Sequence, residues 1–156
     1  MKHYTTADFP FRKSIAHHLA AANQLKDRML DKYLGHLDIT AAQFKVLFFI
    51  GHNRANTPAE LCRELSLDSG SMTRMLDRLE KKELLLRHPC PNDRRSIRLK
   101  LSPAGEAINA QAPEIATSAM NDLVECLSAE ELQTLVGLLD KVLSAHGASV
   151  QPAEEN

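Results

Sequence analysis

The middle of the chain carries the start signals of two short helices separated by a tight break. Thr57 is expected to cap the first helix, with Pro58 at its first position and Glu60 at the capping-box position. After the break, Asp68 or Ser69 is expected to cap the second helix. Two short helices joined in this way are typical of the helix-turn-helix, which strongly limits the folds that the chain can adopt.

A basic hairpin is predicted directly after this pair. Residues 84–88 are a short strand candidate, residues 89–95 are dense in turn residues, and residues 97–101 alternate apolar and basic side chains. Arg94 and Arg95 would then lie in the turn of the hairpin. A helix-turn-helix followed by a hairpin predicts a winged helix-turn-helix.

Apolar stripes at steps of three and four residues predict longer helices on both sides of this lobe. The first stripe runs over residues 11–33, and a capping box at Thr40 opens an apolar helix ahead of the pair. Beyond the hairpin, one helix is expected over residues 102–127, with a potential kink at Pro113, and a last helix after Ser128. Because these outer helices are more apolar than one small lobe needs, we expect them to pack against a second copy of the chain.

The expected fold class is thus mainly α (α+β), a winged helix-turn-helix with long N- and C-terminal dimerisation helices. Residues 11–36 and 102–146 are assigned to the helical dimerisation region, and residues 37–101 to the winged helix-turn-helix lobe. Residues 1–10 and 147–156 are expected to be flexible tails.

Composition excludes several other classes of protein. Of the 156 residues, 44% are hydrophobic and 25% are charged, which is ordinary for a globular protein and unlike a disordered one. No apolar run is long enough for a membrane-spanning helix, and the N-terminus lacks the apolar core of a signal peptide. The three scattered cysteines form neither a disulfide framework nor a zinc-finger spacing, so a cytoplasmic location is expected.

The net charge of −1 is unevenly distributed along the chain. Residues 1–53 carry a charge of +3, residues 54–100 carry +4, and residues 101–156 carry −8. A basic middle favours a polyanionic partner for the lobe, although an acidic helix pair that is merely solvated would give the same asymmetry.

No pattern in the chain nominates an enzyme. There is no Gly-rich phosphate loop, no GxSxG elbow and no HExxH pair, so no catalytic residue, metal or cofactor is expected. The adjacent His17 and His18 point to different sides of a helix and cannot hold one ion together. Cys90 lies beside basic residues that could favour a thiolate, which leaves a redox role open.

The second helix of the pair has the surface that a recognition helix needs. Its small and polar N-terminal side chains allow a close approach to base edges in the major groove, where Arg74 could contact a guanine or a phosphate. Arg94 and Arg95 of the hairpin can reach a narrow minor groove, and Arg98 extends the basic strip toward phosphates. The alternative is an ordinary amphipathic helix whose arginines are solvated. The residues expected to contact DNA are Ser69, Ser71, Thr73, Arg74, Arg78, Arg94, Arg95 and Arg98.

Three segments resemble the MarR family of bacterial transcription regulators. They are LDITAAQFKVL at residues 37–47, MTRMLDRL at residues 72–79, and PNDRR at residues 91–95 followed shortly by LKLS. The most specific mark of the resemblance is Asp93 with Arg95 in the predicted wing. The resemblance implies a homodimer, a pseudo-palindromic operator in double-stranded DNA, and repression relieved by small aromatic or phenolic ligands.

The resemblance also implies an effector pocket between the dimerisation helices and the DNA-binding lobe. Arg78 could instead contact a phosphate, and Arg87 could instead form an ion pair within the chain. Some members of the family sense peroxide through a cysteine near the N-terminus, and others bind zinc through His and acidic residues. The sequence supports neither mode, because the first helix has no cysteine and no convincing set of His and acidic residues is found. The positions that resemble phenolate-contacting ones are Pro58, Thr73, Met75, Arg78 and Arg87.

Together these observations predict a dimeric repressor that binds a specific DNA sequence and that a small aromatic ligand releases. A protein-interaction module built on the same winged helix is the alternative from another class. Within the same class, the alternatives are an activator and a regulator that responds to no small molecule.

Overall fold

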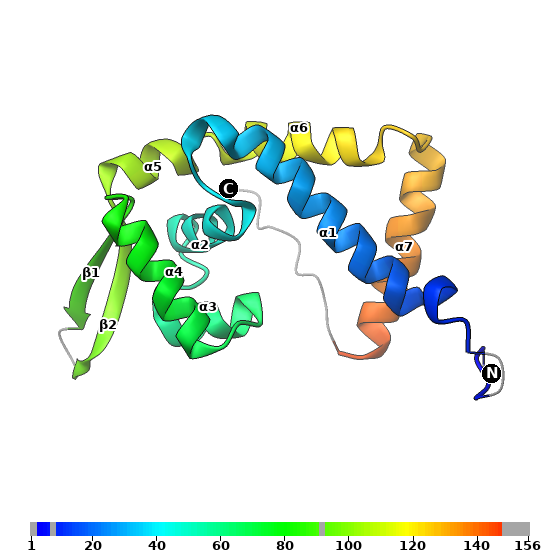
Figure 1. Cartoon of the computed structure of the whole chain (residues 1–156), viewed down its shortest axis with the longest axis horizontal. Coiled ribbons are helices and arrows are strands. Elements are labelled where there is room, and N and C mark those ends of the chain that lie inside the picture. The colour runs from blue at the N-terminus through cyan, green and yellow to red at the C-terminus, as the bar shows by residue number, and fades with distance from the viewer. Residues whose placement is uncertain (1–2, 7–8, 91–92, 148–156) are drawn as a thin grey trace. The chain divides into compact units, whose positions relative to one another are not determined.

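The computed structural model describes residues 3–6, 9–90 and 93–147, without the side chains of residues 93–96. The chain divides into two compact units, residues 1–120 and residues 121–156 (Figure 1). In chain order the elements are η1 (Phe11–Lys13), α1 (Ile15–Leu34), η2 (Gly35–Leu37), α2 (Ala41–Gly51), α3 (Pro58–Leu65), α4 (Ser69–Lys81), β1 (Leu85–Cys90), β2 (Asp93–Leu101), α5 (Pro103–Asn109), α6 (Ala112–Val124) and α7 (Ala129–Ala145).

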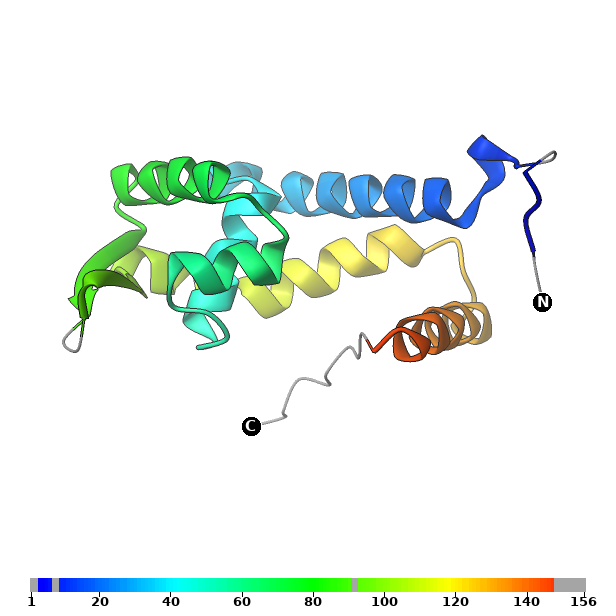
Figure 2. The same ribbon diagram turned by 90° about the horizontal axis from the view of Figure 1, so that it is seen from below.

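This order of elements confirms the predicted fold class. The chain is mainly helical, and the helix-turn-helix pair α3–α4 is followed by the antiparallel hairpin β1–β2. Two views show the hairpin projecting beside α4 at one end of the first unit (Figures 1 and 2). Among the described residues, no helix is long and apolar enough to cross a lipid bilayer.

The predicted helix starts are confirmed at five capped positions. Thr40, Thr57 and Ser128 each form a capping box with the residue three positions later. The side chains of Asp68 and Ser102 each accept a hydrogen bond from a backbone N–H in the first turn of their helix. Each cap satisfies a donor that the helix would otherwise leave unpaired, and a serine or threonine cap is worth about 0.5–2 kcal/mol. Local sequence therefore determines where these helices begin.

The core of the first unit is built around α2. As predicted, this helix is apolar on almost every side, and its Val46 and Leu47 are fully buried. Leu61 of α3, Leu79 of α4 and Leu99 of β2 join the same buried cluster. Because one packed cluster contacts all of these elements, α4 and the hairpin are held together on one scaffold.

The strands of the hairpin are longer than predicted. The sequence indicates a turn over residues 89–95, whereas β1 extends to Cys90 and β2 begins at Asp93. A two-stranded sheet has two open edges, and an edge strand tolerates a proline whose missing N–H would face solvent. Pro89 therefore does not end β1, although the turn-forming residues around it predicted that the strand would end before it.

Two of the outer helices also differ from the prediction. Phe11 lies in η1, and α1 begins only after Ser14, whose hydroxyl oxygen accepts a hydrogen bond from the N–H of His17 at 3.3 Å. The single helix predicted over residues 102–127 is two helices, α5 and α6. Pro113 has no N–H to donate to a carbonyl one turn earlier, so α5 ends ahead of it instead of bending.

Gly105 lies where the first turn of α5 passes close to the chain that enters β1. A Cβ atom at this position would clash with the carbonyl oxygen of Leu84, which is held by a hydrogen bond from the N–H of Ser102 at 3.2 Å. We expect Gly105→Ala to lower the free energy of unfolding by about 1–3 kcal/mol, measured by urea denaturation. Gly137→Ala is the matched control, because its Cβ would meet no described atom within 4 Å. Equal stability of Gly105→Ala and the wild type would contradict this close packing.

Candidate nucleic-acid interface

Helix α4 presents an apolar face to the core and a polar face to solvent. Its side chains Met72, Leu76 and Leu79 are buried, as the apolar spacing predicts. The expected DNA-contacting residues of this helix lie on the other side. The side chains on that side are exposed or half-buried: Ser69, Ser71, Thr73, Arg74 and Arg78.

Hydrogen bonds among its own polar groups hold the first turns of α4. Asp68 accepts one from the backbone N–H of Ser71 at 2.9 Å and another from the hydroxyl of Ser71 at 2.6 Å. Nη2 of Arg74 donates to the same hydroxyl oxygen at 3.2 Å, and the hydroxyl of Thr73 donates to the carbonyl of Ser69 at 2.8 Å. The hydrogen bonds from the side chain and backbone of Ser71 lower the pKa of the Asp68 carboxyl. This carboxylate is therefore charged at neutral pH.

The loop before α3 connects the hairpin to the helix-turn-helix. The carbonyl oxygen of Asn56 accepts a hydrogen bond from the N–H of Leu99 at 2.8 Å. Nη1 of Arg98 donates to the side-chain oxygen of Asn56 at 3.4 Å, and both Arg98 and Lys100 are exposed on β2. These contacts place a basic strand next to the helix-turn-helix pair.

The wing arginines at positions 94 and 95 lie in β2, but their side chains are outside what the structure describes. The backbone register is informative nevertheless. Pro89 pairs with Ile97 and Cys90 pairs with Asp93, so three residues of β2 lie opposite a single step of β1. Such a break in register interrupts the regular pairing of the two strands near the turn.

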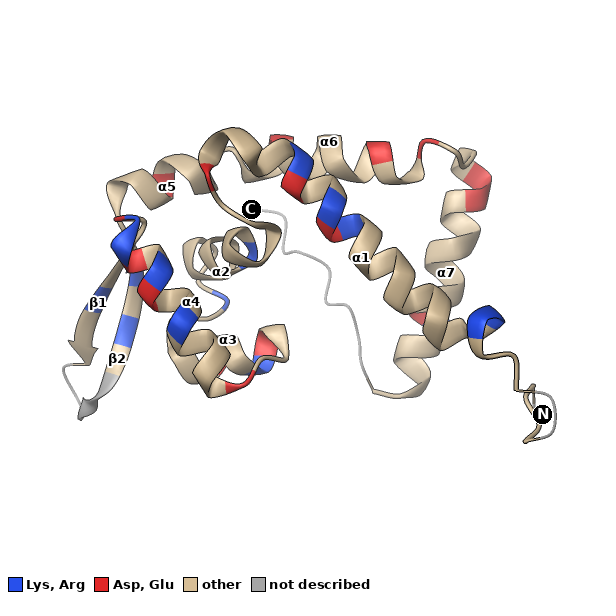
Figure 3. Cartoon of the chain, in the orientation of Figure 1, with Lys and Arg blue, Asp and Glu red and all other residues tan. Residues whose placement is uncertain are grey.

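Charge is divided among the elements as the sequence predicts. In Figure 3, blue Lys and Arg positions lie on the two strands and, among red ones, on α1 and α4, whereas α5, α6 and α7 carry mainly red Asp and Glu positions. The blue positions of α4 and of the strands thus lie on elements that share one core.

Arg87 of β1 forms ion pairs with two acidic residues of α4. Its Nη2 lies 2.6 Å from Oδ1 of Asp77, and its Nε lies 3.4 Å from Oε2 of Glu80. The Arg87 side chain is only 27% exposed, so water shields this pair less than a fully exposed one. The structure thus contains the internal ion pair that the sequence left open as an alternative to an effector contact. The pair also ties the hairpin to α4.

The remaining positions of the implied effector pocket are spread over α3 and α4. Pro58 is the first residue of α3, Met75 packs half-buried against the core, and Arg78 is exposed on α4. A hollow in the lobe has a different lining, made by Glu80, Glu83, Leu85, Leu86, Ser102, Pro103 and Ala104.

Cysteines and possible metal ligands are scattered over the described residues. No group of three or more His, Cys, Asp or Glu among them is placed to hold a metal ion. Cys62 is half-buried on α3, and Cys126 is exposed. Cys90 ends β1, directly before the two residues, 91 and 92, that lie outside the description.

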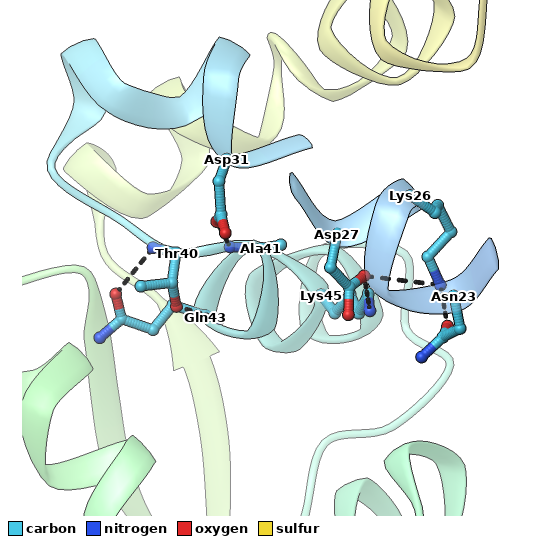
Figure 4. A network of polar contacts seen from close by, with 8 residues as sticks. All are labelled: Asn23, Lys26, Asp27, Asp31, Thr40, Ala41, Gln43 and Lys45. Atoms are coloured by element: carbon cyan, nitrogen blue, oxygen red, sulfur yellow. Dashed lines mark hydrogen bonds and ion pairs between the residues drawn. The ribbon is translucent and has the colours of Figure 1, made fainter. Parts of the chain in front are cut away.

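Sequence reasoning missed a polar cluster that joins α1 to α2 (Figure 4). Nζ of Lys45 donates to Oδ1 of Asp27 at 2.6 Å, and the N–H of Ala41 donates to Oδ1 of Asp31 at 2.6 Å. Burial raises the pKa of Asp27, but the hydrogen bond from Lys45 and the charge of Lys26 outweigh it, so this pKa lies below its ordinary value. These bonds link residues 18 and 10 positions apart, a separation that no helical spacing signals. They fix α1 to the lobe.

The Glu60 carboxylate holds the start of α3 and gives a pH-dependent stability. It accepts hydrogen bonds from the N–H of Asn56 at 2.9 Å and of Thr57 at 3.0 Å, and the first of these lowers its pKa most. A lowered pKa stabilises the fold above the pKa of the unfolded chain, and this gain is lost as pH falls through the folded value. We expect Glu60→Gln to lose about 0.5–1 kcal/mol at pH 7 and almost nothing at pH 3, measured by urea denaturation. Glu64→Gln, an exposed carboxylate of the same helix, is the control; the same loss at both pH values would contradict the prediction.

Two sequence comparisons place the chain among known proteins. A model of the MarR family matches residues 39–97, which include the helix-turn-helix pair and most of the hairpin. Over 122 residues, the chain is 48% identical to the multiple antibiotic resistance protein MarR of Escherichia coli strain K12. This match covers 78% of the chain and 85% of that protein.

Solved structures of the E. coli protein have a similar fold. The crystal structure of its reduced form matches with a TM-score of 0.78 at 45% identity, covering 83% of this chain and 96% of that chain. A cysteine-to-serine mutant of MarR complexed with operator DNA matches with a TM-score of 0.77 at 44% identity. The second match covers 87% of this chain and 99% of that chain.

Proposed function

The chain belongs to the MarR family of transcription regulators, and on this premise we propose that it is a repressor that binds a pseudo-palindromic operator as a homodimer. One observation carries the proposal: the similarity to MarR complexed with operator DNA, at a TM-score of 0.77 over 87% of this chain. The polar face of α4 and the adjoining basic hairpin supply the surface that such a complex needs.

In the proposed complex, α4 enters the major groove and the hairpin reaches the minor groove beside it. A two-fold dimer places its two recognition helices in successive major grooves, about 34 Å apart. Arg74 and Arg78 contact bases or phosphates from α4, and Arg98 contacts a phosphate from β2. The wing arginines follow the narrow minor groove, where the negative potential of DNA is deepest.

The proposed dimer accounts for apolar surface that each unit leaves exposed. On α1, Ile15 is 54% and Leu19 is 45% exposed, and on α7, Leu138 is 59% and Val142 is 54% exposed. Apolar faces of this kind mark interaction sites, and a homodimer covers them with the same faces of a second copy. We therefore assign the outer helices to dimerisation and residues 37–101 to DNA binding.

We further propose that a small aromatic or phenolic ligand releases the repressor from DNA. Such a ligand weakens DNA binding only as far as it prefers a different spacing of the two DNA-binding lobes. Arg87 already forms ion pairs with Asp77 and Glu80. It can bind the anionic group of the ligand only if it shares its donors with these partners or gives them up. Arg78, exposed on the same helix, is the second candidate.

The relatives of the chain are transcription regulators, a class without catalytic activity. We propose the same for this chain and place it in the cytoplasm, where bacterial operators are found. The proposal uses no cofactor.

Selection of bound fragments from random and genomic duplex DNA tests the proposed function. We expect enrichment of an inverted repeat, and an affinity that falls steeply as salt rises because phosphate contacts release counterions. Small phenolic carboxylates are then added to the complex with the enriched site, and at least one should release the DNA.

Binding without enrichment, or with little dependence on salt, would refute a sequence-specific repressor and favour a protein-interaction module. Enrichment of a single half-site would refute the dimeric operator. Release by none of the phenolic carboxylates would leave the repressor intact and overturn only its proposed effector.

A further inference from the structure

A chain of three hydrogen-bonded side chains runs along the solvent face at the start of α4. It begins at Asp68, whose Oδ2 accepts the hydroxyl proton of Ser71 at 2.6 Å. It ends at Arg74, whose Nη2 donates to the oxygen of the same hydroxyl at 3.2 Å. These residues are three positions apart, which on a helix places them on one side.

Counting donors shows which of these side chains is left to contact DNA. A serine hydroxyl has one proton, and Ser71 gives its proton to Asp68. The hydroxyl of Thr73 likewise gives its proton to the carbonyl of Ser69 at 2.8 Å. Arg74 has five N–H donors, of which the bond to Ser71 uses one. Of Ser71, Thr73 and Arg74, only the arginine therefore keeps donors for the acceptor atoms of a base.

Gly70 provides the space in which this chain of side chains forms. A Cβ atom at Gly70 would lie 3.2 Å from Oδ1 of Asp68 and 3.6 Å from Nη1 of Arg74. The guanidinium thus lies over the glycine, with one nitrogen against it and the other on the serine hydroxyl. Two points of contact restrain a side chain that would otherwise sample many rotamers in solvent.

We propose that Asp68 and Ser71 are positioning residues that orient the guanidinium of Arg74 for a bidentate contact with one guanine in each half-site. The proposal rests on the proposed function and deepens it, because it names the base and the group that reads it. A guanidinium with two free parallel donors matches O6 and N7 of guanine in the major groove. Restraining it before binding reduces the entropy lost when the contact forms. Ser71 then acts through Arg74 and makes no direct contact with DNA.

The test measures discrimination by the full-length protein. Affinity is compared between the selected operator and operators in which each G·C pair is replaced in turn. We expect Arg74→Ala to lose at least about 5-fold discrimination at one G·C pair per half-site and little elsewhere. Ser71→Ala should lose at least about 3-fold at the same pair, and it should have no further effect in a protein that already carries Arg74→Ala. Ser144→Ala is the matched control, because it removes an exposed serine hydroxyl from the polar face of α7, outside the DNA-binding lobe, and it should leave that pair unaffected.

Different results would contradict the guanine contact of Arg74, the positioning role of Ser71 and the proposed function. A uniform loss over all sequences in Arg74→Ala, with a smaller salt dependence, would identify a phosphate contact instead of a guanine contact. An effect of Ser71→Ala that persists in the Arg74→Ala protein would identify a direct DNA contact by Ser71. No loss of discrimination in Ser71→Ala would overturn its positioning role. Failure of the wild type to select any sequence would overturn the proposed function as well, whereas the other outcomes leave that function standing.

Asp68→Asn separates the charge of the first residue from its role as a helix cap. Asparagine caps a helix about as well as aspartate, so the fold is retained, and thermal unfolding verifies this. A neutral amide oxygen is a weaker acceptor for the Ser71 hydroxyl than a carboxylate. We expect a loss of discrimination of about 2-fold at the same G·C pair, and an unchanged value there would exclude the carboxylate from the positioning chain.

Discussion

Replacing Arg95 by alanine should weaken binding to the selected operator by at least about 30-fold and leave the dimer intact. A contact between an arginine and DNA is worth about 1 kcal/mol or more, and a dimer that loses two such contacts loses about twice that free energy. Arg95 lies in the part of β2 where three residues oppose one step of β1. In the proposed complex this arginine follows a narrow minor groove, where the negative potential of DNA is deepest.

The matched control for this variant is Arg28→Ala, which removes the same charge from the exposed surface of α1. Binding is measured by fluorescence anisotropy at several salt concentrations, and the dimer by analytical ultracentrifugation. The two variants should behave alike if only net charge steers the chain to DNA. Equal affinities of both variants and the wild type would show that the wing does not contact DNA.

The parts of the fold that the sequence predicts well are those with local causes. Thr40, Thr57 and Ser128 cap helices because each supplies an acceptor within three residues of the donor that needs it. The inward face of α4 follows in the same way from spacings of three and four residues. Both kinds of signal lie within one turn of helix, so they can be read without knowledge of the fold.

The parts that the sequence could not predict depend on distant partners. The contact of Lys45 with Asp27 and that of Lys82 with Asp38 join residues 18 and 44 positions apart. Neither separation corresponds to a helical or strand repeat, so only the packed core brings these charges together. The prediction that Pro89 belongs to a turn was wrong for a related reason. A proline is tolerated in β1 because both strands of a two-stranded sheet are edge strands, and the local sequence does not show this.

The candidate site was predicted only in part from the sequence. Residue types and spacing were enough to place Arg74 and Arg78 on the outward face of α4, with Thr73 at its flank. They did not show that Ser71 gives its proton to Asp68, because several rotamers of a serine at this spacing are compatible with the sequence. They also left the role of Arg87 open between an effector contact and an ion pair, and the structure contains the ion pair.

Changing the apolar face of α7 should abolish the dimer and, with it, tight DNA binding. No described residue of α7 is buried, and Leu135, Leu138 and Val142 are 45%, 59% and 54% exposed. Most of the stability of a helix in a protein comes from packing of its apolar face, so we expect this face to be covered. We expect Leu138→Asp with Val142→Asp, and also truncation before Ser128, to give monomers in analytical ultracentrifugation.

Loss of the dimer should also weaken operator binding, because a dimer holds two DNA-binding lobes that bind the two half-sites together. Binding of the second lobe is intramolecular in a dimer and bimolecular in a monomer, so operator affinity should fall by about 100-fold or more. The matched control is Gln133→Asp with Ser144→Asp, which adds the same charge to the opposite, polar face of α7 and should change neither property. The point variants guard against a truncated chain that fails to fold, and circular dichroism verifies their helix content. Variants that remain dimeric and bind the operator as the wild type does would remove α7 from the interface and leave the apolar face of α1 to form it alone.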